Sequence, residues 1–361
     1  MIEIEMEVDT LNILNLNIFD AIKSGDLNSF KSIVLNDVNK LQEKTDKNNV
    51  PFYVSCLNGH MDIAQWIYSI CPEQIHLLSH DNKCTPFYAS CHNGHIDIAQ
   101  WIYSVCPEQI STPNKIKCTP FYVACLNGHL QLAQWIHSVD PNQMYIKNMD
   151  DCTPFYASCY SGHMDIAQWI YSISPEQISV TSKNNCTPFY VVCYNGHIDM
   201  AQWIYSIDPN QIHIKKVYGC TPFYVACQKG YLQLSQWIYN ICPKQFYIRS
   251  NSGYSPFLAT CQSGHMDVAK WLIDINETLQ YDVHVGSGHN WEKVSPNSNF
   301  TTELGNYIAD KEIQKQQEHQ HCDQLQDLVK DLQQQLSILK QQKKSDQECE
   351  PDYRRKISKK F

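Results

Sequence analysis

The chain has 361 residues, of which 43% are hydrophobic and 18% charged, and its formal net charge is −9. This composition excludes a wholly disordered chain, and the acidic balance disfavours nucleic acid or an anionic membrane as a partner. The opening residues MIEIEMEVDT carry acids where a signal peptide would be basic, and no apolar run of about 18 residues follows. We therefore expect a cytoplasmic, non-secreted protein with no membrane partner, whose 17 cysteines are reduced thiols.

A repeat of 34 residues dominates the chain. The tripeptide Pro-Phe-Tyr returns with steps of 35 and then 34 residues, and a Pro-Phe-Leu variant closes the series. One tryptophan and one glycine recur in each unit at the same period. The prolines are Pro51, Pro86, Pro120, Pro154, Pro188, Pro222 and Pro256; the tryptophans are Trp66, Trp101, Trp135, Trp169, Trp203, Trp237 and Trp271; the glycines are Gly59, Gly94, Gly128, Gly162, Gly196, Gly230 and Gly264.

The chain begins with an extension over residues 1–17 and a degenerate unit over 18–50. Gly25 lies 34 residues before Gly59, in the segment AIKSGDLNSFKSIV, which keeps the small–Gly–apolar rhythm without the proline or the tryptophan. Terminal units of a repeat array are commonly atypical because they cover the end of the stack. We therefore predict a capping unit here.

Each full unit predicts a short first helix. Thr85 is suited to cap its N-terminus and Pro86 to occupy the first helical position, where a missing N–H costs nothing. Gly94 suits the left-handed conformation that closes a helix. The first helix of each unit should therefore be about two turns long.

A second helix follows in each unit. In MDIAQWIYSI, helical spacing places Ile63, Ala64, Ile67 and Ile70 on one apolar face. Pro72 and its counterparts should stop this helix, after which about ten polar residues lead back to the next Thr-Pro.

This plan of helix, turn, helix and extended connection, at a period near 33, resembles the ankyrin-repeat family. The family signature Thr-Pro-Leu-His reads Thr-Pro-Phe-Tyr here, and the Gly-His that follows in the family is present in six units, first at Gly59-His60. The resemblance covers about residues 18–280 and implies an all-α ankyrin-repeat solenoid with seven repeats over 51–283. Pro-Glu-Gln or Pro-Asn-Gln stands where the family has Gly-Ala-Asp, so we expect irregular finger connections.

The residues that repeat most faithfully are predicted to be stacking residues. Trp66 and its counterparts should lie buried between neighbouring units, because a single unit cannot cover its own apolar face. Fifteen of the 17 cysteines occupy three fixed places and should be small buried residues. These cysteines are Cys56, Cys91, Cys125, Cys159, Cys193, Cys227 and Cys261 on the first helix, Cys84, Cys118, Cys152, Cys186 and Cys220 before Thr-Pro, and Cys71, Cys106 and Cys242 after the second helix.

The recurring Cys-x-x-x-His pairs, such as Cys56 and His60, offer two other interpretations that the spacing disfavours. Tetrahedral zinc needs four converging ligands, and each unit supplies two. A catalytic dyad is a single asymmetric arrangement with an orienting group, whereas these pairs are copied six times. We predict no metal, no cofactor and no enzymatic activity, and expect the histidines to hydrogen-bond neighbouring loops.

The positions that vary between units are the candidates for binding. One set follows the first-helix cysteine and the other lies in the finger before Thr-Pro, and in ankyrin arrays similar sets line the concave groove. Tolerated drift explains any single residue about as well as a contact does, but aromatic residues dominate interface energetics. The predicted partner-binding residues are Asp81, Lys83, His92, Lys115, Lys117, Leu126, Asp150, Tyr160, Tyr194, Tyr218 and Gln228.

Beyond the array we predict a linker over 284–305 and a Gln-rich helix over 306–344. Cys322, Leu325, Val329, Leu332, Leu336 and Leu339 follow a heptad spacing of 3 and 4 residues. This spacing fits a short coiled coil that self-associates through 322–339, and it fits equally an amphipathic helix that folds back on the array. Residues 345–361 should be a basic, disordered tail.

The basic tail leaves its own alternatives open. Lys343-Lys344 with Arg354-Arg355-Lys356 resembles a bipartite nuclear import signal, so a nuclear location is the alternative to the cytoplasm, and a simple solvated tail is the competing interpretation.

These observations predict an intracellular protein–protein interaction scaffold that binds a protein partner through its concave groove. The alternative is a substrate-recruiting adaptor subunit of an enzyme complex, for example a ubiquitin ligase, that docks through the C-terminal helix.

Overall fold

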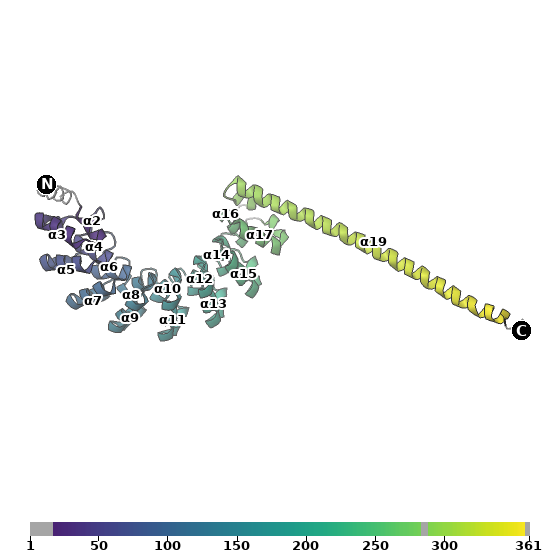
Figure 1. Cartoon of the computed structure of the whole chain (residues 1–361), viewed down its shortest axis with the longest axis horizontal. Coiled ribbons are helices and arrows are strands. Elements are labelled where there is room, and N and C mark those ends of the chain that lie inside the picture. The colour runs from purple at the N-terminus through teal and green to yellow at the C-terminus, as the bar shows by residue number, and fades with distance from the viewer. Residues whose placement is uncertain (1–16, 283–287, 358–361) are drawn as a thin grey trace, which may run out of the picture.

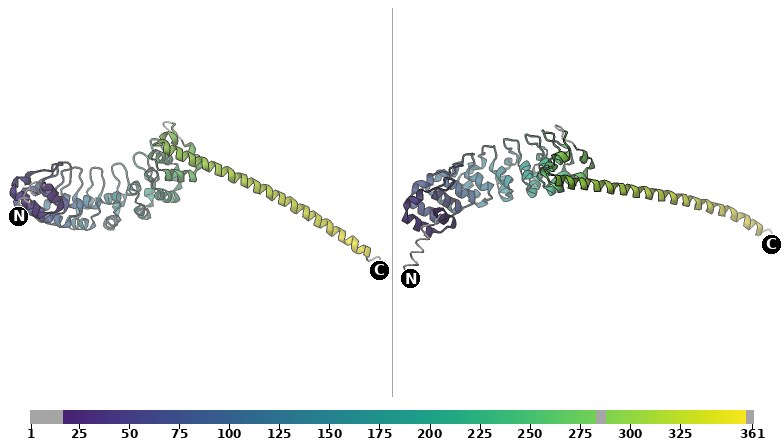
Figure 2. Two further views of the ribbon diagram at one scale, coloured as in Figure 1. Left: turned by 45° about the horizontal axis from the view of Figure 1, so that its top comes forward. Right: turned by 90° about the horizontal axis from the view of Figure 1, so that it is seen from above.

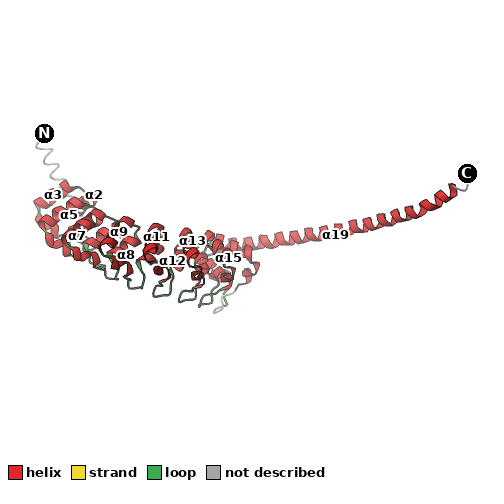
Figure 3. Cartoon of the chain, turned by 90° about the horizontal axis from the view of Figure 1, so that it is seen from below, coloured by secondary structure: helices red, strands yellow, loops and turns green. Residues whose placement is uncertain are grey.

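In a computed structural model, residues 17–282 and 288–357 are described, and these residues form helices and turns but no strand. The repeat units stack into an arc with an inner row of helices on the concave side and an outer row on the convex side (Figure 1). The loops between units all project from one edge of the arc (Figure 3). The predicted all-α solenoid with a C-terminal helix is confirmed.

The two rows alternate along the chain. The inner helices are α2 (Ile18–Ser24), α4 (Pro51–Asn58), α6 (Pro86–Asn93), α8 (Pro120–Leu126), α10 (Pro154–Ser161), α12 (Pro188–Asn195), α14 (Pro222–Gln228) and α16 (Pro256–Ser263). The outer helices are α3 (Leu27–Asn36), α5 (Met61–Ile70), α7 (Ile96–Val105), α9 (Leu130–Val139), α11 (Met164–Ile173), α13 (Ile198–Ile207), α15 (Leu232–Ile241) and α17 (Met266–Ile275).

The predicted caps bound the inner helices. The Thr85 hydroxyl accepts the backbone N–H of Tyr88 at 3.0 Å, with Pro86 at the first helical position. Gly94 closes α6 at φ 79°, and a Cβ there would lie 2.5 Å from the ring of His129. Glycine is therefore required at this turn both for its conformation and for the approach of the next unit.

The apolar face of the outer helix is narrower than the sequence predicts. Ile63, Ala64 and Ile67 are fully buried, but Ile70 is 42% exposed, so its assignment to the core is wrong. Ile70 is the last residue of α5, where the chain turns away, and Cys71 occupies the buried place instead.

The segment expected to be a polar connection begins with a 3-10 helix. Pro72 both ends α5 and opens this helix, in which Gln74 and Ile75 are buried. The 3-10 helices of successive units are η1 (Val38–Gln42), η2 (Pro72–His76), η3 (Pro107–Ser111), η4 (Pro141–Tyr145), η5 (Pro175–Ser179), η6 (Pro209–His213), η7 (Pro243–Tyr247) and η8 (Glu277–Tyr281).

The fingers beyond these 3-10 helices repeat one tight turn, closed by backbone hydrogen bonds such as Asn114 N–H to Cys118 O and Ser182 N–H to Cys186 O, each at 3.0 Å, so the expectation of irregular fingers is corrected. Successive fingers are joined by backbone hydrogen bonds such as Lys115 N–H to Asn82 O at 2.7 Å and Lys183 N–H to Asp150 O at 2.8 Å, without forming a strand among the described residues.

Tryptophan and phenylalanine share the stacking between units. Trp101 packs edge-on against Tyr68 of the preceding unit at 5.6 Å between ring centroids, and lies 6.0 Å from Phe52. Phe52 is fully buried, whereas Trp101 is only partly buried, so the expectation that the tryptophans are the buried centre of each interface is corrected. The cysteines of the inner helices are buried as predicted, for example Cys56 and Cys91 at 0% exposure.

Part of the segment predicted to be a linker is folded onto the last repeat. It forms α18 (Trp291–Val294) and the start of α19 (Ser298–Ile357), which begins earlier than the predicted helix and continues through most of the tail expected to be disordered. Trp291, Phe300 and Leu304 are buried against the array. None of the described helices combines the length and apolarity that crossing a bilayer would require.

Candidate binding groove

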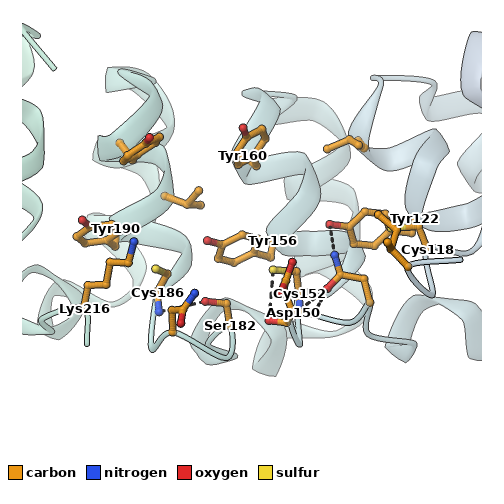
Figure 4. Close-up of a pocket in the computed structure, with 16 residues that line it drawn as sticks. Cys118, Tyr122, Asp150, Cys152, Tyr156, Tyr160, Ser182, Cys186, Tyr190 and Lys216 are labelled. Atoms are coloured by element: carbon orange, nitrogen blue, oxygen red, sulfur yellow. Dashed lines mark hydrogen bonds between the residues drawn. The ribbon is translucent and has the colours of Figure 1, made fainter. Parts of the chain in front are cut away.

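A hollow of about 500 Å³ opens on the concave side of the array (Figure 4). It is bounded by the inner helices α8, α10 and α12 and by four consecutive fingers. Its lining residues are Ile116, Cys118, Tyr122, Leu126, Asn148, Asp150, Cys152, Tyr156, Tyr160, Ser182, Asn184, Cys186, Tyr190, Val191, Tyr194 and Lys216.

Tyrosines of the Pro-Phe-Tyr motif form the floor. Tyr122, Tyr156 and Tyr190 lie in a row, one from each inner helix (Figure 4). The Asn148 side-chain amide donates to the Tyr122 hydroxyl at 3.2 Å and so ties a finger to the floor. Burial raises the pKa of all three tyrosines above the ordinary value. The floor is therefore aromatic and neutral.

Three thiols lie beside these tyrosines at the base of the fingers. Burial raises the pKa of Cys118 to about 11 and that of Cys152 to about 12. Because the thiolate is the reactive form, Cys118 and Cys152 are weak nucleophiles near neutral pH. They contribute small apolar surface rather than catalytic chemistry.

The rim of the hollow carries the more exposed side chains. Tyr160, at 49% exposure, stands on the helix side, and Asp150 and Lys216 come from the fingers. The Lys229 ammonium lies 4.3 Å from the ring centroid of Tyr194, within range of a cation–π interaction. The rim combines aromatic surface with charges of both signs.

The structure brings four of the predicted binding residues together. Leu126, Asp150, Tyr160 and Tyr194 line the hollow. The other predicted residues are not among its lining: Asp81, Lys83, Lys115, Lys117 and Tyr218 are on fingers, and His92 and Gln228 are near the ends of α6 and α14.

The floor tyrosines were not among the predicted binding residues, because the residues that repeat most faithfully were expected to stack between units. The available signal was the motif itself, since Tyr122, Tyr156 and Tyr190 stand where the resembled family has histidine. A repeated residue can face a groove in every unit as readily as it can face a neighbour.

Charge is segregated between the two sides of the five central repeat units. In the five units that span residues 61–231, the outer helices with their 3-10 helices carry nine acids and no Lys or Arg, while the fingers with the inner helices carry eight lysines and three aspartates. The pattern does not extend to the next unit, whose outer elements α15 and η7 carry Lys244 and no acid. The outer stretches counted are 61–76, 96–111, 130–145, 164–179 and 198–213, and the inner stretches are 77–95, 112–129, 146–163, 180–197 and 214–231. The groove side is therefore net positive, at +5, in a chain that is acidic overall.

The recurring histidines hold neighbouring units together, as predicted. His95 Nε2 donates to the Leu57 carbonyl at 3.2 Å, and the ring of His95 lies against the position of Gly59. The same contact joins His197 to the Tyr160 carbonyl at 3.2 Å. These imidazoles are structural links between units.

One group of donors on the described chain has the composition of a partial metal site. The Cys106 thiol donates to Glu108 Oε1 at 2.8 Å, and His76 Nδ1 lies 3.8 Å from its sulfur. Ser174 makes the same hydrogen bond to Glu176, so the contact recurs where neither thiol nor imidazole is present. Burial also raises the pKa of Cys106 to about 11, which disfavours the thiolate that a metal requires. This cluster is better explained as a repeated turn contact.

Residues 121–213 match the family model for ankyrin repeats in three copies. This segment includes α8, α10 and α12 and most of the hollow. Comparison with curated proteins finds no match to the chain.

Proposed function

Because this chain is an ankyrin-repeat protein, and ankyrin repeats are protein–protein interaction modules, we propose that it binds an extended segment of a partner protein along the concave groove. The hollow between α8, α10, α12 and their fingers carries this proposal. Its neutral tyrosine floor can accept an apolar or aromatic side chain, and the tyrosine hydroxyls and finger amides can bond a peptide backbone.

The charge distribution indicates which segment fits. A net positive groove side attracts acidic residues, and the acidic outer side repels them. Asp150 interrupts the basic edge at the hollow, so a uniform polyanion such as nucleic acid is a poor match. The preferred ligand is an extended peptide with an aromatic or apolar anchor flanked by acids.

Selection from a random peptide display library on the full chain tests this proposal. We expect acidic peptides with an aromatic residue to be enriched. Combined substitution Tyr160→Ala and Tyr194→Ala should weaken them about 30-fold, as loss of a binding hot spot does. The matched control is Tyr145→Ala with Tyr247→Ala, because both tyrosines are exposed and lie outside the hollow.

A second part of this test changes the charge at the edge of the hollow. Lys216→Glu should weaken the selected peptides, and Lys244→Glu should not, because Lys244 is on η7 rather than in the hollow. Equal binding by the groove variants and the wild type would show that the peptides bind elsewhere.

The adaptor alternative stays a prediction. It requires an enzymatic subunit that docks on α19. Capture of such a subunit by the full chain, and its loss on Leu332→Lys substitution, would support it.

A further inference from the structure

The distal part of α19 leaves the array and carries an apolar stripe. Lys315, through its ion pair with Glu277, belongs to the part of the helix that still contacts the last repeat. Beyond it the helix projects away in every view (Figure 2). Leu325, Val329 and Leu332 are 49%, 51% and 55% exposed, so the fold-back alternative is not adopted by these residues.

The stripe has a defined heptad register. Cys322, Val329 and Leu336 occupy the a positions, and Leu325, Leu332 and Leu339 the d positions. Leu336 and Leu339 are 55% and 61% exposed. Val329 is the one β-branched residue at a, and all three d residues are leucine; a β-branched residue at a with leucine at d favours two parallel strands.

We propose that two copies of this chain pair through residues 322–339 as a parallel, in-register two-stranded coiled coil. This pairing involves no residue of the groove. Either proposal can therefore be wrong while the other is right. In this register each a and d residue meets its own counterpart, and Cys322 lies next to Cys322 of the second copy.

The flanking positions support a second copy as the occupant. In a parallel pair each g residue faces the following e residue of the other chain. The resulting pairs are His321 with Gln326, Leu328 with Gln333 and Gln335 with Lys340. None of these pairs joins like charges, so the surface is compatible with a second copy of itself.

The first experiment measures the molar mass of the full chain in solution by light scattering. We expect the mass of two chains for the wild type and of one chain for Leu332→Lys, whose charge would lie in the centre of the seam. The matched control is Ile338→Lys, since Ile338 is 46% exposed but occupies an outward c position and should leave the dimer intact. A single-chain mass for the wild type, or a dimeric Leu332→Lys variant, would overturn the proposal.

The second experiment tests the parallel register. On a Cys349→Ser background, mild oxidation with diamide should join two chains through Cys322, and Cys322→Ser should abolish the product. A disulfide needs the two Cα atoms within about 7 Å, whereas an antiparallel pair would separate them by about 25 Å. A dimer that gives no disulfide-linked product would rule out the parallel arrangement.

Discussion

At the scale of single residues, a buried glutamine links each repeat to the one before it. Gln211 accepts the backbone N–H of Phe189 at 3.1 Å and donates to the Ile178 carbonyl at 2.8 Å. Both partners are backbone groups that the fold would otherwise leave buried and unsatisfied. The same pair of bonds is made by Gln74, Gln109, Gln143 and Gln245.

Replacing this glutamine should destabilise the fold, because its one side chain bonds two buried backbone groups. Gln211→Leu leaves two buried groups without partners, at about 1–3 kcal/mol each, and should lower the free energy of unfolding accordingly. Urea denaturation of the full chain, followed by circular dichroism, measures the loss. Gln177→Leu is the matched control, since Gln177 donates to the Met144 carbonyl but its Oε1 has no partner among the described residues. Equal losses in the two variants would refute the bridging role.

The sequence predicted the residues whose partners are close in sequence, and it did not predict those whose partners are in another part of the unit or in another unit. The Thr85 cap and the Gly94 turn follow from short-range rules, and both are confirmed. Gln109 recurs at the period of the repeat, but its partners lie 22 and 34 residues away, so spacing alone did not reveal them. The floor tyrosines were missed for the same reason, because which side of a helix faces a groove depends on how the units curve.

At the scale of elements, the array ends in a cap that the sequence did not predict. Trp291 lies 34 residues after Phe257 and takes the buried place of that phenylalanine series. Polar contacts reinforce α19 on α17: Tyr307 donates to Asp274 at 2.6 Å and Lys270 pairs with Glu303 at 2.7 Å. The glycines and serines before this segment indicated a linker, so the cap was not predicted. Trp291 nevertheless keeps the 34-residue period of the repeats.

The cap should contribute directly to the stability of the array. Leu304 is fully buried, so Leu304→Ala should cost about 2–5 kcal/mol of the free energy of unfolding. Ile338→Ala, on the exposed part of the same helix, should cost nothing measurable. Thermal denaturation of both variants checks the difference, and an unchanged midpoint for Leu304→Ala would mean that α19 does not stabilise the array.

At the scale of the whole molecule, two surfaces with different chemistry lie on separate parts of the chain. The hollow is aromatic and lies on the side of the five central units that is net positive, and α19 presents aliphatic side chains well beyond the array. A parallel pair of helices would hold two grooves on one assembly, which raises avidity for a partner that carries repeated segments. The repeat period in the sequence predicts that the units stack. The segregation of charge follows only from the structure, which places the two rows of helices on opposite sides.

The two ends of the stack should differ in stability. In a repeat array each unit is stabilised by its neighbours, so an end unit opens first unless another element covers it. Among the described residues, the end at α2 and α3 is covered on one side only, by the next repeat, whereas α16 and α17 are covered by α18 and α19. Hydrogen exchange followed by mass spectrometry should therefore show faster exchange in α2 and α3 than in α16 and α17. Leu304→Ala should speed exchange in α16 and α17 and leave α2 and α3 unchanged, because the lost packing is local to the covered end. Faster exchange at α16 and α17 in the wild type would show that the α18–α19 segment does not protect this end in solution.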